Sequence, residues 1–335
     1  MLTRAAATPL DPEAIFASLE GARGLLLAVS GGPDSMALLG LADRWRKGCA
    51  TKMAVATVDH GLRSGSRAEA EAVGEIARAR AFDHAILTWT GDKPEAGRPA
   101  AARGARYRLL ADHAAALGAD TIVTAHHADD QAETALMRLL RGSGPAGLAG
   151  MAALGPVPGR EASGLRLARP LLPFAKGDLI AFCRAQGIAF FDDPTNADET
   201  YRRPQIRRLA ALLAAEGFGR EQILRLAARA ARSEQALATL VAEKLAALPA
   251  RRAPGLFEAA ATDVARLPEE ALVRLLTAEI AGIGSGPAPR LDRLETLVRR
   301  LRAGAPVAAT LGGVCVRLDA HKLVLKPEAP RRTGP

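Results

Sequence analysis

Short apolar runs alternate with amphipathic stretches along the first part of the chain. Four runs have the length and the apolar composition of buried strands: Leu25–Val29, Met53–Val58, Ala85–Trp89 and Thr121–Ala125. Alanine-rich segments between them, such as 67–80 and 100–117, carry apolar residues at helical spacing. This alternation is typical of βαβ units, so it predicts an α/β fold with a doubly wound, mostly parallel sheet and helices on both faces.

The pattern becomes mainly helical further along the chain. Gly, Ala and Pro dominate 142–160, which favours a loop, and 192–196 has the composition of a turn. Helices are predicted at 176–186, 205–216, 222–245, 268–280 and 290–302. Two alternating runs at 314–318 and 322–326 predict a small terminal β-hairpin. A break at Gly217-Phe218-Gly219 places the domain boundary, giving a first domain of 1–218 and a second of 219–335.

The first apolar run stops at Ser30-Gly31-Gly32-Pro33-Asp34-Ser35, just before an apolar helical segment. A strand, a glycine turn and a helix N-terminus aim backbone N–H groups at an anion, and glycine lets a phosphate approach closely. Ser30 and Ser35 can add hydroxyl donors, and Asp34 can hold Mg²⁺ beside the phosphates. The loop lacks the lysine of a Walker-type site. The alternative is a plain turn in which Asp34 or Ser35 caps the helix.

Two further polar clusters follow strand ends. Asp59 and His60 come after the second strand, and His126-His127-Ala128-Asp129-Asp130-Gln131-Ala132-Glu133-Thr134 comes after the fourth. In an open α/β sheet, ligands bind beyond the carboxyl ends of the strands, where all three clusters fall. Asp130 and Glu133 share a helical face and can bind an ammonium group, while His126 can meet a phosphate or a reacting group. Zinc ligation and simple N-capping are the alternatives, although the histidine spacing differs from that of the zincins.

Composition narrows the class of protein. The 335 residues suffice for two or three domains, and 45 Lys and Arg against 36 Asp and Glu give a net charge of +9, which favours a polyanionic partner. With 4% aromatic residues, extensive base stacking on aromatic platforms is not expected. Three distant cysteines form neither a C-x-x-C pair nor a zinc pattern and are expected to be buried thiols, and no secretory or membrane-spanning segment is evident. We therefore expect a cytoplasmic protein without a membrane partner.

Several motifs occur in an order that resembles a known family. The phosphate loop is followed by Val58-Asp59-His60-Gly61-Leu62-Arg63, Ala102-Arg103-Gly104-Ala105-Arg106-Tyr107, the histidine–carboxylate block, Arg138–Gly144, Gly147–Met151, Arg169–Leu172 and Asp193–Asn196. Over about residues 20–215 the chain resembles the tRNA(Ile)-lysidine synthetase family of PP-loop ATP pyrophosphatases.

The resemblance implies a ligase that joins free L-lysine to C2 of the wobble cytidine in a tRNA(Ile) with a CAU anticodon. ATP first adenylates the cytidine, releasing diphosphate, and lysine then displaces AMP. It also implies that ATP is bound by Ser30, Gly31, Gly32, Pro33, Asp34, Ser35, Asp59, His60 and Arg106, with Mg²⁺ on Asp34. The implied catalytic residues are Asp34, His126, Asp130, Glu133 and Arg207.

The chain departs from the family pattern at one motif, where Arg203-Pro204-Gln205-Ile206-Arg207 has proline in place of the usual asparagine. Pro204 removes an N–H donor, whereas Arg203 and Arg207 still align. The tRNA backbone is expected to contact basic residues of the second domain, for which a solvated helix face is the alternative: Arg225, Arg229, Arg232, Arg299, Arg300 and Arg302.

Three other functions compete with this interpretation. A PP-loop tRNA thiolase would need sulfur-handling cysteines or an iron–sulfur cluster, and Cys49, Cys183 and Cys315 lack the spacing. An ammonia-using amide synthetase leaves the basic second domain unexplained. A non-catalytic RNA-binding protein that kept an ATP fold is the third. The oligomeric state is not determined by the sequence, and a homodimer is one alternative.

Overall fold

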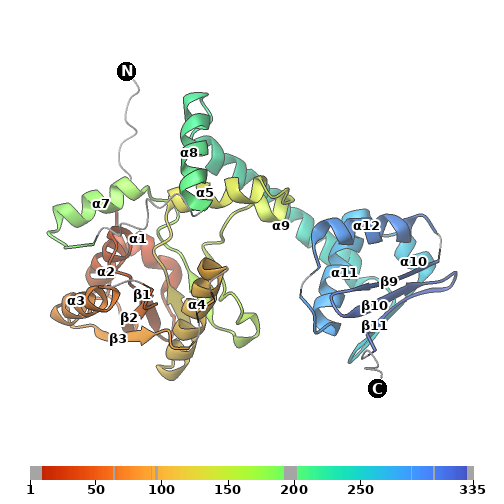
Figure 1. The fold of residues 1–335 in the computed structure, drawn as a ribbon, viewed down its shortest axis with the longest axis horizontal. Coiled ribbons are helices and arrows are strands. Elements are labelled where there is room, and N and C mark those ends of the chain that lie inside the picture. The colour runs from red at the N-terminus through yellow and green to blue at the C-terminus, as the bar shows by residue number, and fades with distance from the viewer. Residues whose placement is uncertain are drawn as a thin grey trace. The chain divides into compact units, whose positions relative to one another are not determined.

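The computed structural model describes residues 10–62, 65–91, 93–94, 97–191, 202–287, 289–304 and 306–329. The chain divides into two compact units, Met1–Ala231 and Arg232–Pro335 (Figure 1). This division lies inside the long helix α9 (Arg220–Ala246), later than the break at 217–219 on which the predicted boundary rests.

A six-stranded sheet forms the centre of the first unit, in the order β3-β2-β1-β4-β6-β5. Its strands are β1 (Leu25–Ala28), β2 (Met53–Asp59), β3 (Asp83–Thr88), β4 (Thr121–Val123), β5 (Leu154–Pro156) and β6 (Arg166–Ala168). All neighbours pair in parallel except β5, which is antiparallel to β6. The four predicted strands and the mostly parallel sheet are confirmed. The structure adds β6, and it adds α6 (Pro145–Leu148) and β5 within the segment predicted as a loop.

The apolar residues of β1 alternate between two cores, one on each face of the sheet. Leu25 and Leu27 pack with the first group of helices, and Leu26 packs with α4 (Arg98–Ala116) on the other face. The first group comprises α1 (Pro12–Phe16), α2 (Pro33–Trp45), α3 (Ser66–Ala79) and α7 (Lys176–Ala185). Each of these leucines is at most 1% exposed, a burial that contributes about 1.5–3 kcal/mol apiece. A strand buried on both faces explains why β1 is apolar throughout.

The strand order reverses beside β1. From β1 the chain proceeds to β2 and β3 on one side, and then crosses to β4 on the other side. In doubly wound sheets the ligand crevice lies at such a switch point, outside the carboxyl ends of the strands. The loops after β1 and β4, which carry two of the predicted clusters, meet at this point.

Three helices form a smaller core beside the sheet. Ala132 and Leu136 of α5 (Ala128–Leu139) pack with Ile206 of α8 (Arg202–Ala215) and with Ile223 at the start of α9. Pro204 lies in the first turn of α8, where a backbone N–H has no partner within the helix, so proline is accommodated there. The predicted turn at 192–196 lies outside the described residues. Short 3₁₀ turns occur at Ala17–Leu19 and Glu161–Ser163.

The second unit contains an antiparallel five-stranded sheet in the order β7-β8-β11-β10-β9. The predicted terminal hairpin is confirmed as β10 (Val314–Leu318) and β11 (Lys322–Pro327). It is extended by β7 (Ala250–Ala253), β8 (Leu256–Ala260) and β9 (Val307–Leu311). The helices are α10 (Ala261–Ala265), α11 (Glu269–Ile283) and α12 (Leu291–Arg302), and they share one apolar core with the sheet. No helix in the described parts of the chain is long and apolar enough to cross a membrane.

Candidate active site

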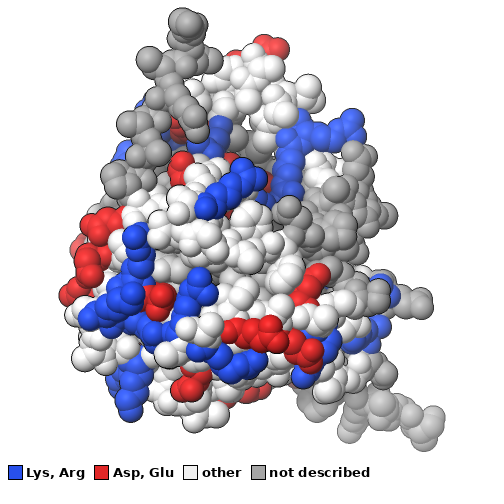
Figure 2. Space-filling model, turned by 90° about the vertical axis from the view of Figure 1, so that its left-hand side faces the viewer, with Lys and Arg blue, Asp and Glu red and all other residues white. Residues whose placement is uncertain are grey.

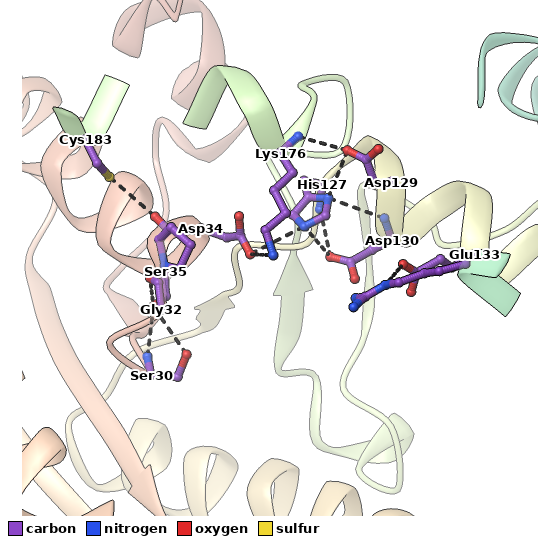
Figure 3. A network of polar contacts seen from close by, with 12 residues as sticks. Ser30, Gly32, Asp34, Ser35, His127, Asp129, Asp130, Glu133, Lys176 and Cys183 are labelled. Carbon is purple, nitrogen blue, oxygen red and sulfur yellow. Dashed lines mark hydrogen bonds and ion pairs between the residues drawn. The ribbon is translucent and has the colours of Figure 1, made fainter. Parts of the chain in front are cut away.

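The loop after β1 is organised by the hydroxyl group of Ser35. Its Oγ accepts hydrogen bonds from the backbone N–H groups of Ser30 and Gly31, both at 3.1 Å, and donates to the carbonyl of Gly32 at 2.9 Å (Figure 3). Ser35 therefore folds the loop onto the helix that begins at Pro33. Since two N–H groups of the loop are used internally, an anion would find its donors in the first turn of α2, whose N–H groups have no partner within the helix.

Gly31 has a backbone conformation that favours glycine. Its φ of +92° lies in the left-handed region, and a Cβ atom would come within 3.0 Å of Phe191 Cδ2 and 3.1 Å of Val73 Cγ2. The carbonyl of Gly31 also accepts the N–H of Phe191 at 2.9 Å. Gly31 thus sets the path of the loop, and it does not line the cavity described below.

A Gly31→Ala variant is expected to lower the free energy of unfolding of the first unit by about 1–3 kcal/mol, because alanine is strained at this φ and contacts Phe191. Urea unfolding followed by tryptophan fluorescence measures this, since Trp45 and Trp89 both belong to the first unit. Gly32→Ala is the matched control: its neighbours leave room for a Cβ, with the nearest atom at 4.0 Å. Equal midpoints for the two variants would contradict the assignment.

A cavity of about 370 Å³ opens beyond the ends of β1 and β4. Ten of the predicted site residues line it: Ser30, Gly32, Pro33, Asp34, Ser35, His60, Arg106, His126, Asp130 and Arg207. Three do not, namely Gly31, Asp59 and Glu133. Asp59 is bound within its own turn, accepting from the Gly61 N–H at 2.9 Å and from Ser66 Oγ at 2.8 Å. Asp59 therefore has no surface in the cavity that could contact ATP directly.

Asp34 combines one paired and one unpaired carboxylate oxygen. Oδ2 lies 3.4 Å from His127 Nε2 and 3.9 Å from Lys176 Nζ (Figure 3). Oδ1 is buried and has no hydrogen-bond partner. A buried carboxylate oxygen without a donor is costly unless a ligand completes it, and hard cations such as Mg²⁺ prefer oxygen ligands. The residue thus fits a magnesium ligand at the mouth of the phosphate loop.

His127 joins the phosphate loop to the start of α5. Its Nε2 lies 3.3 Å from Asp130 Oδ2 as well as 3.4 Å from Asp34 Oδ2, and its Nδ1 lies 3.6 Å from Asp129 Oδ2. Burial alone would lower the pKa of His127, but the hydrogen bond to Asp34 and the surrounding carboxylates raise it. Its ring also caps α5, with Asp130 reciprocating at the His127 N–H. His127 thereby fixes the relative position of Asp34 and Asp130.

His126, the predicted catalytic histidine, has a different environment from its neighbour. Its Nδ1 lies 2.8 Å from Thr124 Oγ1. Burial lowers the pKa of His126 to about 3, and the charges of Arg106 and Arg169 add to the effect against that of Asp130. The imidazole is therefore neutral at physiological pH, so it offers hydrogen bonding rather than positive charge.

Glu133 forms a short ion pair with Arg207, which lines the cavity. The distance from Arg207 Nε to Glu133 Oε1 is 2.6 Å, and this hydrogen bond is the main cause that raises the pKa of Arg207. Glu133 is only 6% exposed. The pair connects α5 to α8, so the structure brings the two predicted residues together as partners.

Several residues of the cavity were not identified as site residues from the sequence, among them Arg103, His127 and Lys176. His127 is adjacent to the predicted residue His126, and Arg103 lies in the same sequence motif as the predicted Arg106. The spacing of His127 and Asp130 is that of an N-cap residue and the third residue of a helix. No local sequence motif identified Lys176, because this residue reaches the cavity only through the packing of α7. Asp129 accepts the Lys176 N–H at 2.9 Å and a bond from Arg220 Nη1 at 3.0 Å, which ties α5 to α7 and α9.

Known proteins resemble this chain in sequence and in fold. The family model of the PP-loop domain matches residues 7–213. The chain is 46% identical to a tRNA(Ile)-lysidine synthase of Methylobacterium nodulans, covering 98% of this chain and 99% of that protein. A tRNA(Ile)-lysidine synthase of Rhodopseudomonas palustris is 45% identical, with 98% and 97% covered. Among solved structures, the U34-tRNA thiolase NcsA of Methanococcus maripaludis has a TM-score of 0.54 at 13% identity, covering 66% of this chain and 78% of its own, a likeness of fold alone.

Proposed function

This chain belongs to the tRNA(Ile)-lysidine synthase family of PP-loop proteins, and from that premise we propose the reaction that its cavity carries out. The protein is an ATP-using ligase that forms C–N bonds. We propose that it joins the ε-amine of free L-lysine to C2 of the wobble cytidine of a CAU-anticodon tRNA(Ile), through an adenylated tRNA. The supporting observation is one cavity in which the phosphate loop, Asp34 and Asp130 lie together.

In the first step, the C2 oxygen of the cytidine attacks the α-phosphorus of ATP and diphosphate leaves. The N–H groups in the first turn of α2 bind the departing phosphates, aided by the positive end of the helix. Lys176, at the cavity wall, adds a cation that can turn from Asp34 toward the phosphates. Neutral His126 can donate a hydrogen bond to a phosphoryl oxygen as charge develops there.

Mg²⁺ fits this site through Asp34. The buried oxygen Oδ1 offers a hard ligand, and in the described residues no group of three or more His, Cys, Asp and Glu side chains could hold a metal alone. A magnesium ion usually takes one or two carboxylates together with substrate phosphates, which matches a single aspartate beside a phosphate loop. When bound, the ion would neutralise charge on the leaving diphosphate.

In the second step, the lysine amine attacks C2 and AMP leaves. Asp130 lines the cavity and binds the incoming ammonium group, and it accepts the proton that must leave before attack. Glu133 lies one helical turn further along α5 and holds Arg207 at the cavity wall. In that position the guanidinium can bind the phosphate of the adenylate.

The decisive experiment incubates the protein with ATP, labelled lysine and unmodified tRNA(Ile), followed by mass analysis of the nucleosides. Lysidine at the wobble position, with one AMP released per lysine incorporated, is the expected result. Release of AMP without incorporation of lysine would overturn the second step.

The thiolase alternative gains no support from the cysteine beside the phosphate loop. The thiol of Cys183 is buried and donates to the carbonyl of Pro33 at 3.4 Å. Burial raises the pKa of Cys183 to about 11, so at neutral pH the group is a thiol and a poor nucleophile.

We further propose that the second unit contributes to tRNA binding. The face of the molecule shown in Figure 2 carries Lys and Arg mixed with Asp and Glu. In α12, by contrast, Arg299, Arg300 and Arg302 are exposed together at the last turn. Such a cluster can neutralise backbone phosphates without reading sequence.

Replacing all three arginines of α12 by glutamine is expected to weaken tRNA binding and to reduce the slope of log K against log salt by about two to three, because each lost phosphate contact removes about 0.9. A salt titration of tRNA binding measures this, with the ATP dissociation constant as the internal control. An unchanged salt slope would show that α12 does not touch the RNA.

A further inference from the structure

Charged residues of both signs line the cavity. Asp34, Glu69 and Asp130 line it together with Lys176 and Arg207, and two further arginines, Arg103 and Arg106, reach it from α4. Three more arginines interact electrostatically with the arginines of α4 or with one another: Arg138 on α5, Arg141 just beyond the end of α5, and Arg169 after β6. We name Arg103, Arg138, Arg141 and Arg169 the arginine cluster.

Backbone carbonyls hold two arginines of the cluster, Arg138 and Arg169, in place without neutralising their charge. Arg138 donates to the carbonyls of Gly147 at 2.9 Å and Gly150 at 2.7 Å, and Arg169 donates to the carbonyl of Ala152 at 2.7 Å. Within the described part of the chain, no ion pair links the cluster to a carboxylate. Backbone carbonyls orient a guanidinium but leave its full charge, so the cluster projects a positive field.

Burial, together with repulsion between the like charges of the cluster, lowers the pKa values of two of its members, Arg138 and Arg169. Burial lowers the pKa of Arg138, and the charges of Arg103 and Arg141 lower it further. Burial likewise lowers the pKa of Arg169, and Arg103 and Arg138 add to it, against the effect of Tyr107. Like charges gathered without a counter-charge indicate a place where an anionic ligand would be stabilised.

Tyr107 keeps Arg103 at the rim of the cavity. The ring is 1% exposed, and the guanidinium carbon of Arg103 lies 5.0 Å from its centroid. Arg106 contacts the same ring at 5.1 Å. A cation packed on an aromatic ring loses less freedom when it binds a ligand, which favours a preformed anion site.

We propose that the arginine cluster is a phosphodiester-binding subsite for the RNA backbone, with Arg103 as the residue that contacts a phosphate next to the nucleotide presented to the cavity. The proposal rests on the proposed function, because it takes the polyanion to be the tRNA substrate. It names a contact surface on the first unit, separate from the arginines of α12.

The position of the cluster distinguishes an RNA backbone from ATP. The phosphate loop and α2 belong to one face of the sheet, whereas α4 belongs to the other. The cluster also runs from the exposed Arg103 at the cavity to the exposed Arg141 just beyond the end of α5. A row of arginines that leads away from the cavity suits a chain of phosphates better than a single triphosphate.

The test compares Arg103→Gln with Arg108→Gln in equilibrium binding of unmodified tRNA(Ile), without ATP or lysine, at several salt concentrations. Arg108 is exposed on the same helix and does not line the cavity, so it controls for the loss of one surface charge. Arg103→Gln is expected to weaken tRNA binding roughly three- to tenfold and to reduce the salt slope by about one. Arg108→Gln should match the wild type, and both variants should keep the ATP dissociation constant.

Two results would overturn the proposal. Equal tRNA affinity and salt slope for Arg103→Gln and the wild type would remove Arg103 from the RNA, and a weaker ATP affinity alone would place it on the triphosphate. Arg141→Gln provides a second variant on an exposed position and should also lower the salt slope. If the wild type forms no lysidine but Arg103→Gln still weakens tRNA binding, the subsite stands and the proposed chemistry fails.

Discussion

An Asp34→Asn variant should fold normally and lose AMP formation by roughly a hundred- to a thousandfold, the range seen when one group that stabilises transition-state charge is removed. The buried oxygen Oδ1 has no partner in the protein, and asparagine keeps the shape of the side chain while removing its charge. The loss should therefore fall on the affinity for Mg²⁺ and on diphosphate departure. AMP release across a magnesium titration, together with circular dichroism, measures both.

Asp43→Asn is the matched control for this variant. Asp43 lies on the same helix, pairs with Arg46 at 3.1 Å and does not line the cavity, so it should retain full activity. Near-normal AMP release by Asp34→Asn at limiting magnesium would remove Asp34 from the metal site.

An Asp130→Asn variant should separate the two chemical steps. Asp130 lines the cavity, and a charge-assisted contact to the lysine ammonium contributes about 1.5–3 kcal/mol, or about ten- to a hundredfold in lysine affinity. Adenylated tRNA should accumulate at a rate closer to the wild type, while lysidine formation requires more lysine. Measuring both products across a lysine titration tests this. If both steps fall equally at saturating lysine, Asp130 serves ATP, magnesium or the fold.

Glu133→Gln gives the informative contrast. Because Glu133 is buried and paired with Arg207, its neutralisation leaves a guanidinium at the cavity without its carboxylate partner. We expect both steps to weaken and the thermal midpoint to fall. A higher lysine requirement at an unchanged midpoint would instead mean that Glu133 contacts lysine directly.

The strands of the first unit could be predicted where many apolar residues stand together. Leu25–Ala28 is buried on both faces and reads as a strand from its composition. By contrast, β5 and β6 have three residues each, too few for a periodic signal. In the second unit, β7 consists of Ala-Arg-Arg-Ala and lies at the edge of its sheet, so its pairing depends on β8 rather than on its own apolar pattern.

The location of the candidate site, at the ends of the strands, could be predicted from the sequence. The side-chain contacts within the site could not. The sequence placed the phosphate loop and the block around His126 at one sheet edge, which the cavity confirms. It did not distinguish the roles of His126 and His127, because the directions of these two side chains depend on the path that the backbone takes after β4. The contact of Glu133 with Arg207 joins residues that are 74 positions apart, so no local pattern reports it.

The contacts of Asp129 bear on the order in which the protein folds during its synthesis. It binds the N-terminus of α7 and, 91 residues further along the chain, Arg220 at the start of α9. A ribosome delivers the chain from its N-terminus, so the six strands and the phosphate loop emerge before Arg207 and Arg220 exist. Contacts between distant segments form late, because the intervening chain must first be ordered. A nascent chain can therefore form the loop after β1 early, whereas the part of the cavity lining that contains Arg207 is completed only when α8 has been synthesised.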